Sequence, residues 1–124
     1  MVRQPIVYVV DDNAASAASL AALMSAIGHK TSLYSSAEQF LEDASTEMTG
    51  CLILDVRLPG ISGPELCQQL QNRRIRLPTI LISGHADSMD QCLTEDTGLL
   101  AFLEKPYSGE QIIEAVSDAM SHVD

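Results

Sequence analysis

Five short apolar runs recur along the chain, and segments of a different periodicity separate them. The first, third and fourth runs are continuous rather than alternating, which is typical of parallel strands that are covered on both faces. We predict strands at Ile6–Val10, Thr31–Tyr34, Cys51–Leu54, Thr79–Ile82 and Ala101–Glu104. The three continuous runs are therefore expected to be the central strands of a sheet.

The segment after Asn13 repeats its large apolar residues at the spacing of a helix. The repeating positions are Leu20, Leu23, Met24 and Ile27. Gly28 follows them at the place where a glycine commonly ends a helix, because it adopts a left-handed backbone without a steric cost. The pattern predicts a helix between the first two strands.

A serine followed three residues later by Glu or Gln marks three further helix starts. In such a capping box the serine oxygen accepts a hydrogen bond from the first turn, while the acid or amide reaches back. The pairs are Ser35 with Glu38, Ser62 with Glu65, and Ser108 with Gln111, and Pro64 adds a first-turn proline to the second. We expect a helix after each serine.

A fifth helix, from Asp87 to about Asp96, is interrupted on its apolar face by Asp90, Glu95 and Asp96. We expect this helix to be short, shifted or mobile. Strand and helix thus alternate five times from residue 1 to 124, without a repeat or linker. This order predicts one α/β domain with a doubly wound parallel sheet, right-handed crossovers and helices on both faces.

Charged or hydroxyl residues stand at four of the five strand ends. They are Asp11 and Asp12 after the first strand, Asp55 after the third, Ser83 after the fourth and Lys105 after the fifth. Parallel strands end at one edge, and ligands bind in open α/β sheets beyond that edge. We therefore expect these five side chains to meet in one crevice.

Three carboxylates close together raise one another's pKa unless a cation joins them. Mg²⁺, or Mn²⁺ in its place, held by Asp12 and Asp55 resolves this conflict, and Lys105 is suited to grip a phosphoryl oxygen. Placing a phosphoryl group on Asp55 gives each residue a role, because Ser83 can then contact a further oxygen. Asp55 is the best nucleophile candidate, since the turn through Pro59 and Gly60 leaves it exposed.

The composition limits the partners and the compartment. Seven Lys and Arg against 17 Asp and Glu give a net charge of −10, so nucleic acid and anionic membranes would repel the chain. The chain has no apolar stretch long enough for a membrane span and no signal peptide, which predicts a soluble, cytoplasmic protein. Cys51, Cys67 and Cys92 match neither a metal site nor a disulfide framework, so we expect three reduced thiols.

Four motifs together resemble the receiver domain of two-component response regulators. They are VVDD at residues 9–12, ILDVRLPGISG at 53–63, ISG at 82–84 and FLEKP at 102–106. The resemblance covers essentially the whole chain, and the motifs are specific in order and spacing. DVRLPGISG, ISGHAD and FLEKPY look most like the FixJ-like, LuxR-type subgroup, whose members usually carry a DNA-binding domain after the receiver.

The resemblance implies a flavodoxin-like (CheY-like) fold of five parallel strands in the order 2-1-3-4-5. It implies that Asp55 is the phosphoacceptor and that Lys105 binds phosphate, with a cis bond before Pro106. Ser83 and Phe102 would be the switch hydroxyl and the switch aromatic. The implied Mg²⁺ ligands are Asp11, Asp12, Asp55 and the carbonyl of Arg57. In the family, the positions of Arg57 and His85 tune the lifetime of the acyl phosphate, and a role as plain loop residues stays open for both.

The implied function is a phosphorylation-activated switch rather than an enzyme. A sensor histidine kinase would supply the phosphoryl group, an output domain would receive the signal, and a phosphorylated homodimer is a further expectation. The irregular segment at Asp87–Asp96 makes a dimer through that face less certain. The chain ends at SHVD without an output domain, so we expect a fragment of a two-domain transcription factor rather than a free-standing receiver.

Three other functions are alternatives to the switch. A haloacid-dehalogenase-type phosphatase places a DxD pair after its first strand, whereas Asp11 and Asp12 are adjacent. A flavodoxin-like cofactor protein needs a phosphate-cradling Ser/Gly loop where DDNAAS stands. A pseudo-receiver that binds partners without phosphorylation stays open, because Ser83 replaces the commoner threonine.

Overall fold

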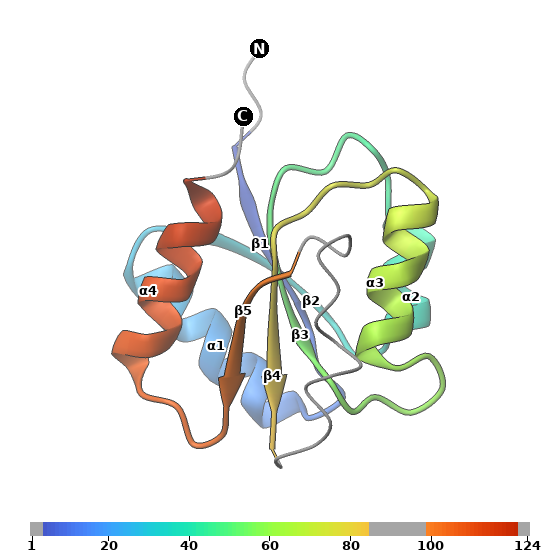
Figure 1. The fold of residues 1–124 in the computed structure, drawn as a ribbon. Helices are drawn as coiled ribbons and strands as arrows, with labels where there is room; N and C mark the ends of the chain where they lie inside the picture. The colour runs from blue at the N-terminus through green and yellow to red at the C-terminus, as the bar shows by residue number, and fades with distance from the viewer. Residues whose placement is uncertain (1–3, 85–98, 122–124) are drawn as a thin grey trace.

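The computed structural model describes residues 4–84 and 99–121, in which five parallel strands form one sheet (Figure 1). The strands are β1 (Ile6–Val10), β2 (Lys30–Tyr34), β3 (Gly50–Asp55), β4 (Thr79–Ser83) and β5 (Leu99–Glu104). Their order is β2-β1-β3-β4-β5, so β2 and β5 are the edge strands and β3 is central. The predicted fold, strand order and strand positions are confirmed, with the observed bounds differing by at most two residues from those predicted.

Helices cover both faces of the sheet. They are α1 (Ala14–Ala26), α2 (Ala37–Asp43), α3 (Gly63–Asn72) and α4 (Gly109–Met120). Figure 1 shows α1 and α4 on one face and α2 and α3 on the other. The predicted helix at Asp87–Asp96 lies outside the described residues.

Alternate residues of the buried strands feed two separate cores. In β1, Val7 and Val9 join the core beneath α1 and α4, whereas Tyr8 and Val10 join the core beneath α2 and α3. Each strand side chain points to the face opposite its neighbour's, so a continuous apolar strand is needed when both faces are covered. This is the reason that the central runs of the sequence do not alternate.

Two of the three predicted serine caps form as expected, and Asn13 caps the first helix in the same way. Asn13, Ser62 and Ser108 each accept a hydrogen bond from the backbone N–H three residues later. The reciprocal bond of a capping box forms in α4, where the Gln111 side chain accepts from the Ser108 N–H. In α3 the Ser62 hydroxyl instead donates to the Glu65 carboxylate, so the predicted backward contact of Glu65 is wrong.

The predicted cap of α2 is wrong by one residue. Ser36, not Ser35, accepts the Gln39 N–H at 3.1 Å. The side-chain oxygen of Gln39 then accepts from both the N–H and the hydroxyl of Ser35. Because Glu38 and Gln39 follow two consecutive serines, both registers satisfy the capping pattern, and the fold selects the second.

The first helix agrees with its prediction at every named position that carries the apolar face or ends the helix, except at Ile27. Leu20 and Met24 are buried as expected, and Gly28 ends the helix with a φ of +92°. Ile27, however, is 40% exposed and lies outside the apolar face that its spacing predicted. It occupies the C-cap, where the helical direction of the side chain is already lost.

The end of α3 has the hydrogen bonds of a Schellman motif. The N–H of Arg74 donates to the Gln71 carbonyl and the N–H of Ile75 to the Leu70 carbonyl. This closure places Arg74 in the left-handed region, with a φ of +60°. The side chain of Arg73 donates to the Leu41 carbonyl at 3.0 Å and so joins the end of α3 to α2.

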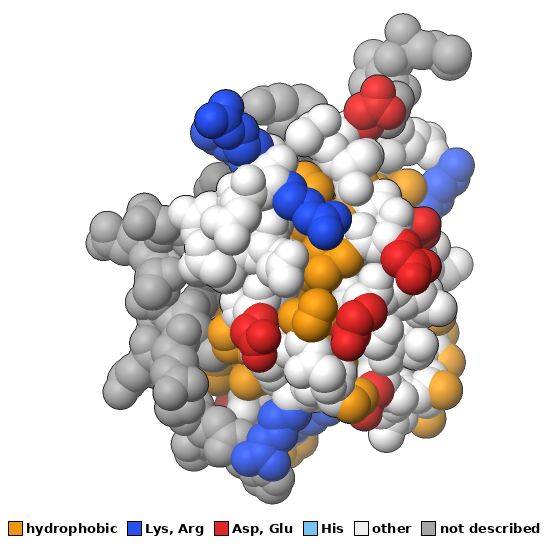
Figure 2. All heavy atoms as spheres, turned by 90° about the vertical axis from the view of Figure 1, so that its right-hand side faces the viewer, with side chains coloured by type: hydrophobic (Ala, Val, Ile, Leu, Met, Phe, Trp, Pro, Cys, Tyr) orange, Lys and Arg blue, Asp and Glu red, His pale blue; other side chains and the backbone are white. Residues whose placement is uncertain are grey.

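The surface over α2 and α3 carries charges of both signs around an apolar strip (Figure 2). Arg73, Arg74 and Arg76 are all exposed, as expected of a solvated helix end. In the described ranges no helix is long and apolar enough to cross a membrane. Cys51 and Cys67 are free and buried, and burial raises the pKa of the Cys51 thiol to about 12, while Cys92 lies outside the described residues.

Candidate functional site

The carboxyl ends of the strands bring the predicted site residues to one edge of the sheet, the lower edge in Figure 1. Asp11 follows β1, Asp55 ends β3, Ser83 ends β4 and Lys105 follows β5. These strands lie next to one another in the sheet, so residues from four distant parts of the sequence become neighbours. His85 lies outside the described residues.

Asp55 has fixed partners at both carboxylate oxygens. Its Oδ2 lies 3.4 Å from the Nζ of Lys105, and its Oδ1 accepts the backbone N–H of Arg57 at 2.9 Å. The Asp55 side chain is 12% exposed and that of Lys105 is 35% exposed. The carboxylate is therefore held at the surface of the sheet edge, partly shielded yet open to a reactant.

Asp11 is the most deeply placed acid of the edge. It is 6% exposed, and its Oδ1 accepts the backbone N–H of Asn13 at 2.9 Å. Burial raises its pKa above 3.8, and the charges of Asp55 and Asp12 raise it further against the lowering effects of the Asn13 N–H and Lys105. Asp12 stands beside it and is exposed.

Ser83 and Lys105 are linked through the backbone. Ser83 is 1% exposed at the end of β4, and its carbonyl accepts the Lys105 N–H at 2.7 Å. The peptide bond between Lys105 and Pro106 is cis, as the family resemblance implied. The chain thus turns at Lys105 and directs its side chain back to Asp55.

Phe102 lies within β5 rather than at its end. It is half-buried, is paired with Leu81 of β4, and packs against the core beneath α2 and α3. The side chain therefore lies on the face of the sheet that α2 and α3 cover, and the pair of Phe102 with Leu81 comes two residue pairs before the pair that contains Ser83. Its position is that of a partly buried core aromatic.

Tyr107 is a residue of this edge that the sequence did not single out. It is half-buried against the core beneath α1 and α4, and burial raises its pKa. Lys105 lowers that pKa, and the charges of Asp11 and Asp55 raise it, so the phenol lies within electrostatic range of the acids. The aromatic that ends the FLEKPY motif was the signal for it.

The loop after β3 requires a glycine. Gly60 has a φ of +78°, and a Cβ there would meet the carboxylate of Glu38 in the first turn of α2. The loop then returns so that the N–H of Gly63 donates to the Val56 carbonyl. This turn directs the chain away from Asp55 and leaves the sheet edge open.

The donor set fits a hard divalent cation. Carboxylate oxygens and a backbone carbonyl are the ligands that Mg²⁺ prefers, and Asp11, Asp12, Asp55 and Arg57 supply them near this edge. Within residues 4–84 and 99–121, however, no three His, Cys, Asp or Glu side chains converge closely enough to form a metal-binding group. A cation here would draw part of its coordination from water or from a phosphoryl group.

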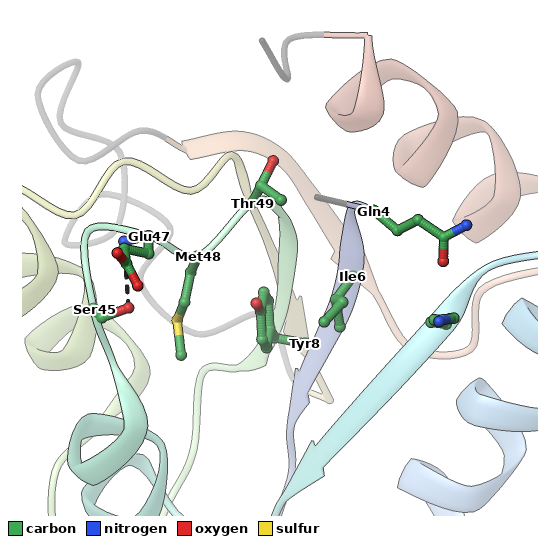
Figure 3. A pocket seen from close by; sticks show the side chains of 8 residues that line it. Gln4, Ile6, Tyr8, Ser45, Glu47, Met48 and Thr49 are labelled. Atoms are coloured by element: carbon green, nitrogen blue, oxygen red, sulfur yellow. Dashed lines mark hydrogen bonds between the residues drawn. The ribbon is translucent and has the colours of Figure 1, made fainter. Parts of the chain in front are cut away.

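A cavity of about 350 Å³ lies at the opposite end of the sheet (Figure 3). Ile6, Tyr8 and Met48 form its apolar part, and Lys30 and Glu47 contribute charged groups. None of the acids at the strand ends lines it. The cavity is therefore separate from the candidate site.

Comparisons with known proteins agree with the geometry. A family model described as "Response regulator receiver domain" matches residues 7–117. The chain is 36% identical over 118 residues to the response regulator protein TodT of Pseudomonas putida F1, covering 95% of the chain and 52% of that protein. It is 36% identical over 117 residues to the transcriptional regulatory protein FixJ of Rhizobium meliloti, covering 94% of the chain and 57% of that protein.

Solved structures give the same result. The chain is similar to a crystal structure of FixJ-N, with a TM-score of 0.88, 34% identity and coverage of 99% of this chain and 98% of that one. It is also similar to the response regulator StyR, with a TM-score of 0.89, 32% identity and coverage of 96% of this chain and 60% of that one.

The chain spans about half the length of the curated relatives named above. Receiver domains of response regulators act as signalling switches of two-component systems, not as classical enzymes. The family match covers nearly all of the described sheet and its surrounding helices. The chain therefore belongs to the response regulator receiver domain family.

Proposed function

We propose that this chain is a phosphorylation-activated switch whose phosphoacceptor is Asp55. The observation that carries the proposal is the contact of Asp55 with Lys105, 3.4 Å long, at an otherwise acidic strand edge. A carboxylate at 12% exposure that faces a compact ammonium has both access to a donor and a group to bind the incoming phosphoryl oxygens. This pairing supports a nucleophilic role better than a purely structural one.

The transfer is an exchange of one bond for another at phosphorus. An Asp55 carboxylate oxygen forms the new P–O bond while the P–N bond to a kinase phosphohistidine breaks, and the imidazole leaves with the electron pair. Lys105 then moves from the carboxylate to a phosphoryl oxygen. Asp11, Asp12, Asp55 and the Arg57 carbonyl would hold Mg²⁺, or Mn²⁺, which when bound neutralises phosphoryl charge.

The response to the phosphoryl group would begin at β4 and β5. Ser83 is the hydroxyl residue that ends β4, and it would move onto a phosphoryl oxygen. Phe102, which is half-buried in the neighbouring strand, would then turn inward. The result is a shift between two populations of the same fold, biased by a local change of charge.

The partners follow from the relatives. We propose a sensor histidine kinase as the phosphodonor and a DNA-binding output domain as the receiver of the signal, since FixJ is a transcriptional regulatory protein. A net charge of −10 argues against direct DNA binding by this domain. The proposed location is the cytoplasm, where such a kinase acceptor would act.

A pseudo-receiver is the competing function. It is favoured by one observation, namely that Ser83 stands where the family more commonly has threonine. In that case the ion pair of Asp55 and Lys105 would stabilise the edge without reacting. The chain would then bind its partners in a single state.

Acetyl phosphate with Mg²⁺ distinguishes the two functions. The expected result is a gain of the mass of one phosphoryl group, measured by intact mass spectrometry and lost in Asp55→Asn. The matched control is Asp43→Asn, which removes an exposed acid at the end of α2 and should leave the gain unchanged. A folded protein that shows no gain in mass at any Mg²⁺ concentration would favour the pseudo-receiver.

A second variant tests the role of Lys105. Lys105→Ala should still accept the phosphoryl group, because Asp55 remains, but should lose the response of β4 and β5. The measurement is the change in amide NMR shifts of Ser83 and Phe102 on phosphorylation. An unchanged response in Lys105→Ala would contradict the role assigned to the lysine.

A further inference from the structure

The outer edge of β2 is open within the part of the chain that the structure describes. β2 pairs with β1 and is the first strand in the sheet order. The carbonyl of Tyr34 accepts the N–H of Asp11, so the backbone groups of Tyr34 point to β1. Because direction alternates along a strand, the backbone groups of Thr31 and Leu33 point outward, where another strand can pair with them.

The side chains along this edge do little to prevent such pairing. Leu33 is 46% exposed, and it and Ile27 are the two exposed large apolar residues in the described ranges. No Asp or Glu occurs between Asp12 and Glu38, although the chain as a whole has a net charge of −10. The segment that forms α1 and β2 therefore carries no carboxylate of its own, so it repels a second acidic chain less than the net charge of the whole chain suggests.

We propose that a second copy of this chain binds along β2, antiparallel, with the two-fold axis at Ser32. In this register Thr31 faces the partner's Leu33, and Leu33 faces the partner's Thr31. Each such pair exchanges two backbone hydrogen bonds, so the four outward-pointing groups of each copy are all satisfied. The two Leu33 side chains become diagonal neighbours on the face that α1 covers.

The opposite face of the edge supplies complementary charges. Lys30, Ser32 and Tyr34 lie on the face of α2, because Ser32 is in register with Tyr8. The hydroxyl of Tyr34 donates to Asp43 at 3.0 Å, which places an exposed carboxylate beside the end of β2. The proposed register puts Lys30 of each copy opposite Tyr34 and Asp43 of the other.

Lys30 is available for this contact. It is exposed at the start of β2, lines the open cavity of Figure 3, and makes no ion pair with the residues that the structure describes. Two symmetric contacts between Lys30 and the partner's Asp43 would therefore form without breaking an existing ion pair. The charges select this register, since a shift by two residues would separate them.

The dimer is independent of the phosphorylation proposed above. β2 is at the opposite edge of the sheet from β5, and the strand-end acids remain open when the two β2 edges pair. Asp55→Asn should therefore leave the dimer intact. A dimer that requires phosphorylation would use a different surface and would not support this proposal.

The first test measures the oligomeric state by sedimentation equilibrium from about 10 µM to about 1 mM protein without a phosphodonor. Thr31→Pro removes one outward N–H from each copy and is expected to weaken the dimer by about tenfold, because two hydrogen bonds are lost. Leu33→Lys should weaken it similarly by bringing two like charges together. Ile27→Lys is the matched control, since it changes the other exposed apolar residue outside β2 and should have no effect.

The second test exchanges the charges. Lys30→Glu and Asp43→Lys should each weaken the dimer, and the double variant Lys30→Glu/Asp43→Lys should restore it, with circular dichroism confirming the fold of each. A chain that remains monomeric to about 1 mM overturns the proposal. A dimer that is insensitive to both Thr31→Pro and Leu33→Lys overturns it as well.

Discussion

Asp11→Asn should stabilise the metal-free fold while impairing its chemistry. Asp11 is 6% exposed and lies near the charges of Asp55 and Asp12. The asparagine has the same shape and keeps the Oδ1 that accepts the N–H of Asn13. The substitution therefore removes an unfavourably buried charge and preserves the local hydrogen bond.

The sign of the effect follows from the pKa of Asp11. Burial and its acidic neighbours raise this pKa above 3.8, so the folded chain binds the proton more tightly than the unfolded chain. The contribution of Asp11 to stability therefore falls as the pH rises from about 3.8 through the raised pKa, and the full cost is present at pH 7. Removing one buried charge that lies near two like charges is expected to raise the free energy of unfolding by on the order of 1 kcal/mol, the usual size of a single-substitution effect.

The assays are urea denaturation and thermal unfolding in a buffer with a metal chelator, at pH 7 and again near pH 4. At pH 7, Asp11→Asn should raise the free energy of unfolding by about 1 kcal/mol and the midpoint of thermal unfolding by about 4 °C. The gain should shrink at the lower pH, where Asp11 of the wild type binds a proton. Asp12→Asn is the matched control, and because Asp12 is exposed its effect should be within about 0.5 kcal/mol.

Two results would refute this reasoning. An Asp11→Asn variant that is less stable than the wild type at pH 7 without metal would show that Asp11 makes a favourable interaction with its surroundings. An equal gain in Asp11→Asn and Asp12→Asn would show that net charge, and not burial, sets the effect.

Three further predictions concern the backbone at Gly60 and Arg74 and the side chain of Tyr34, which packs against the core beneath α2 and α3. Gly60→Ala should lower the free energy of unfolding by about 1 kcal/mol or more in thermal unfolding, because φ at Gly60 is +78°. Gly109→Ala should not, because a Cβ at Gly109 would meet no other atom. Equal effects of the two variants would contradict this. Arg74→Gly should stabilise by about 0.5–1 kcal/mol in urea, because φ is +60°, and a loss would show that the arginine side chain matters. Burial and the hydrogen bond to Asp43 raise the pKa of Tyr34 from 10.0 to about 12. The free energy of unfolding should therefore fall as the pH rises above 10, because the unfolded chain loses this proton first, and it should fall less in Tyr34→Phe. An equal fall in both proteins would exclude Tyr34 as the cause.

The sheet and the contact of Asp55 with Lys105 could be predicted because they follow from strand ends. An apolar run ending in a polar residue fixes both the strand and the place of that residue, and parallel strands then collect such residues at one edge. The two residues are 50 positions apart in the chain, yet the prediction needed no distance information. Strand order came from the family resemblance rather than from the pattern.

The remaining details depend on contacts that the sequence does not encode locally. Two consecutive serines offered α2 two equivalent caps, and tertiary packing chose Ser36 over Ser35. Ile27 kept the spacing of the apolar face but fell at the C-cap, where that face ends. Tyr107 lies outside the predicted strands and helices, so periodicity gives no signal that it is half-buried near the strand-end acids.

The complete burial of Gly50–Leu54 in the central strand has a consequence for measuring the switch. Backbone amides between two hydrogen-bonded neighbours, in a strand without solvent contact, exchange with deuterium mainly when the whole domain unfolds. The exchange rate of β3 is therefore an internal gauge of global stability within each sample. If the exchange rate of another segment changes by the same factor as that of β3, the folding equilibrium of the whole domain has shifted. If it changes by a larger factor, that segment opens locally.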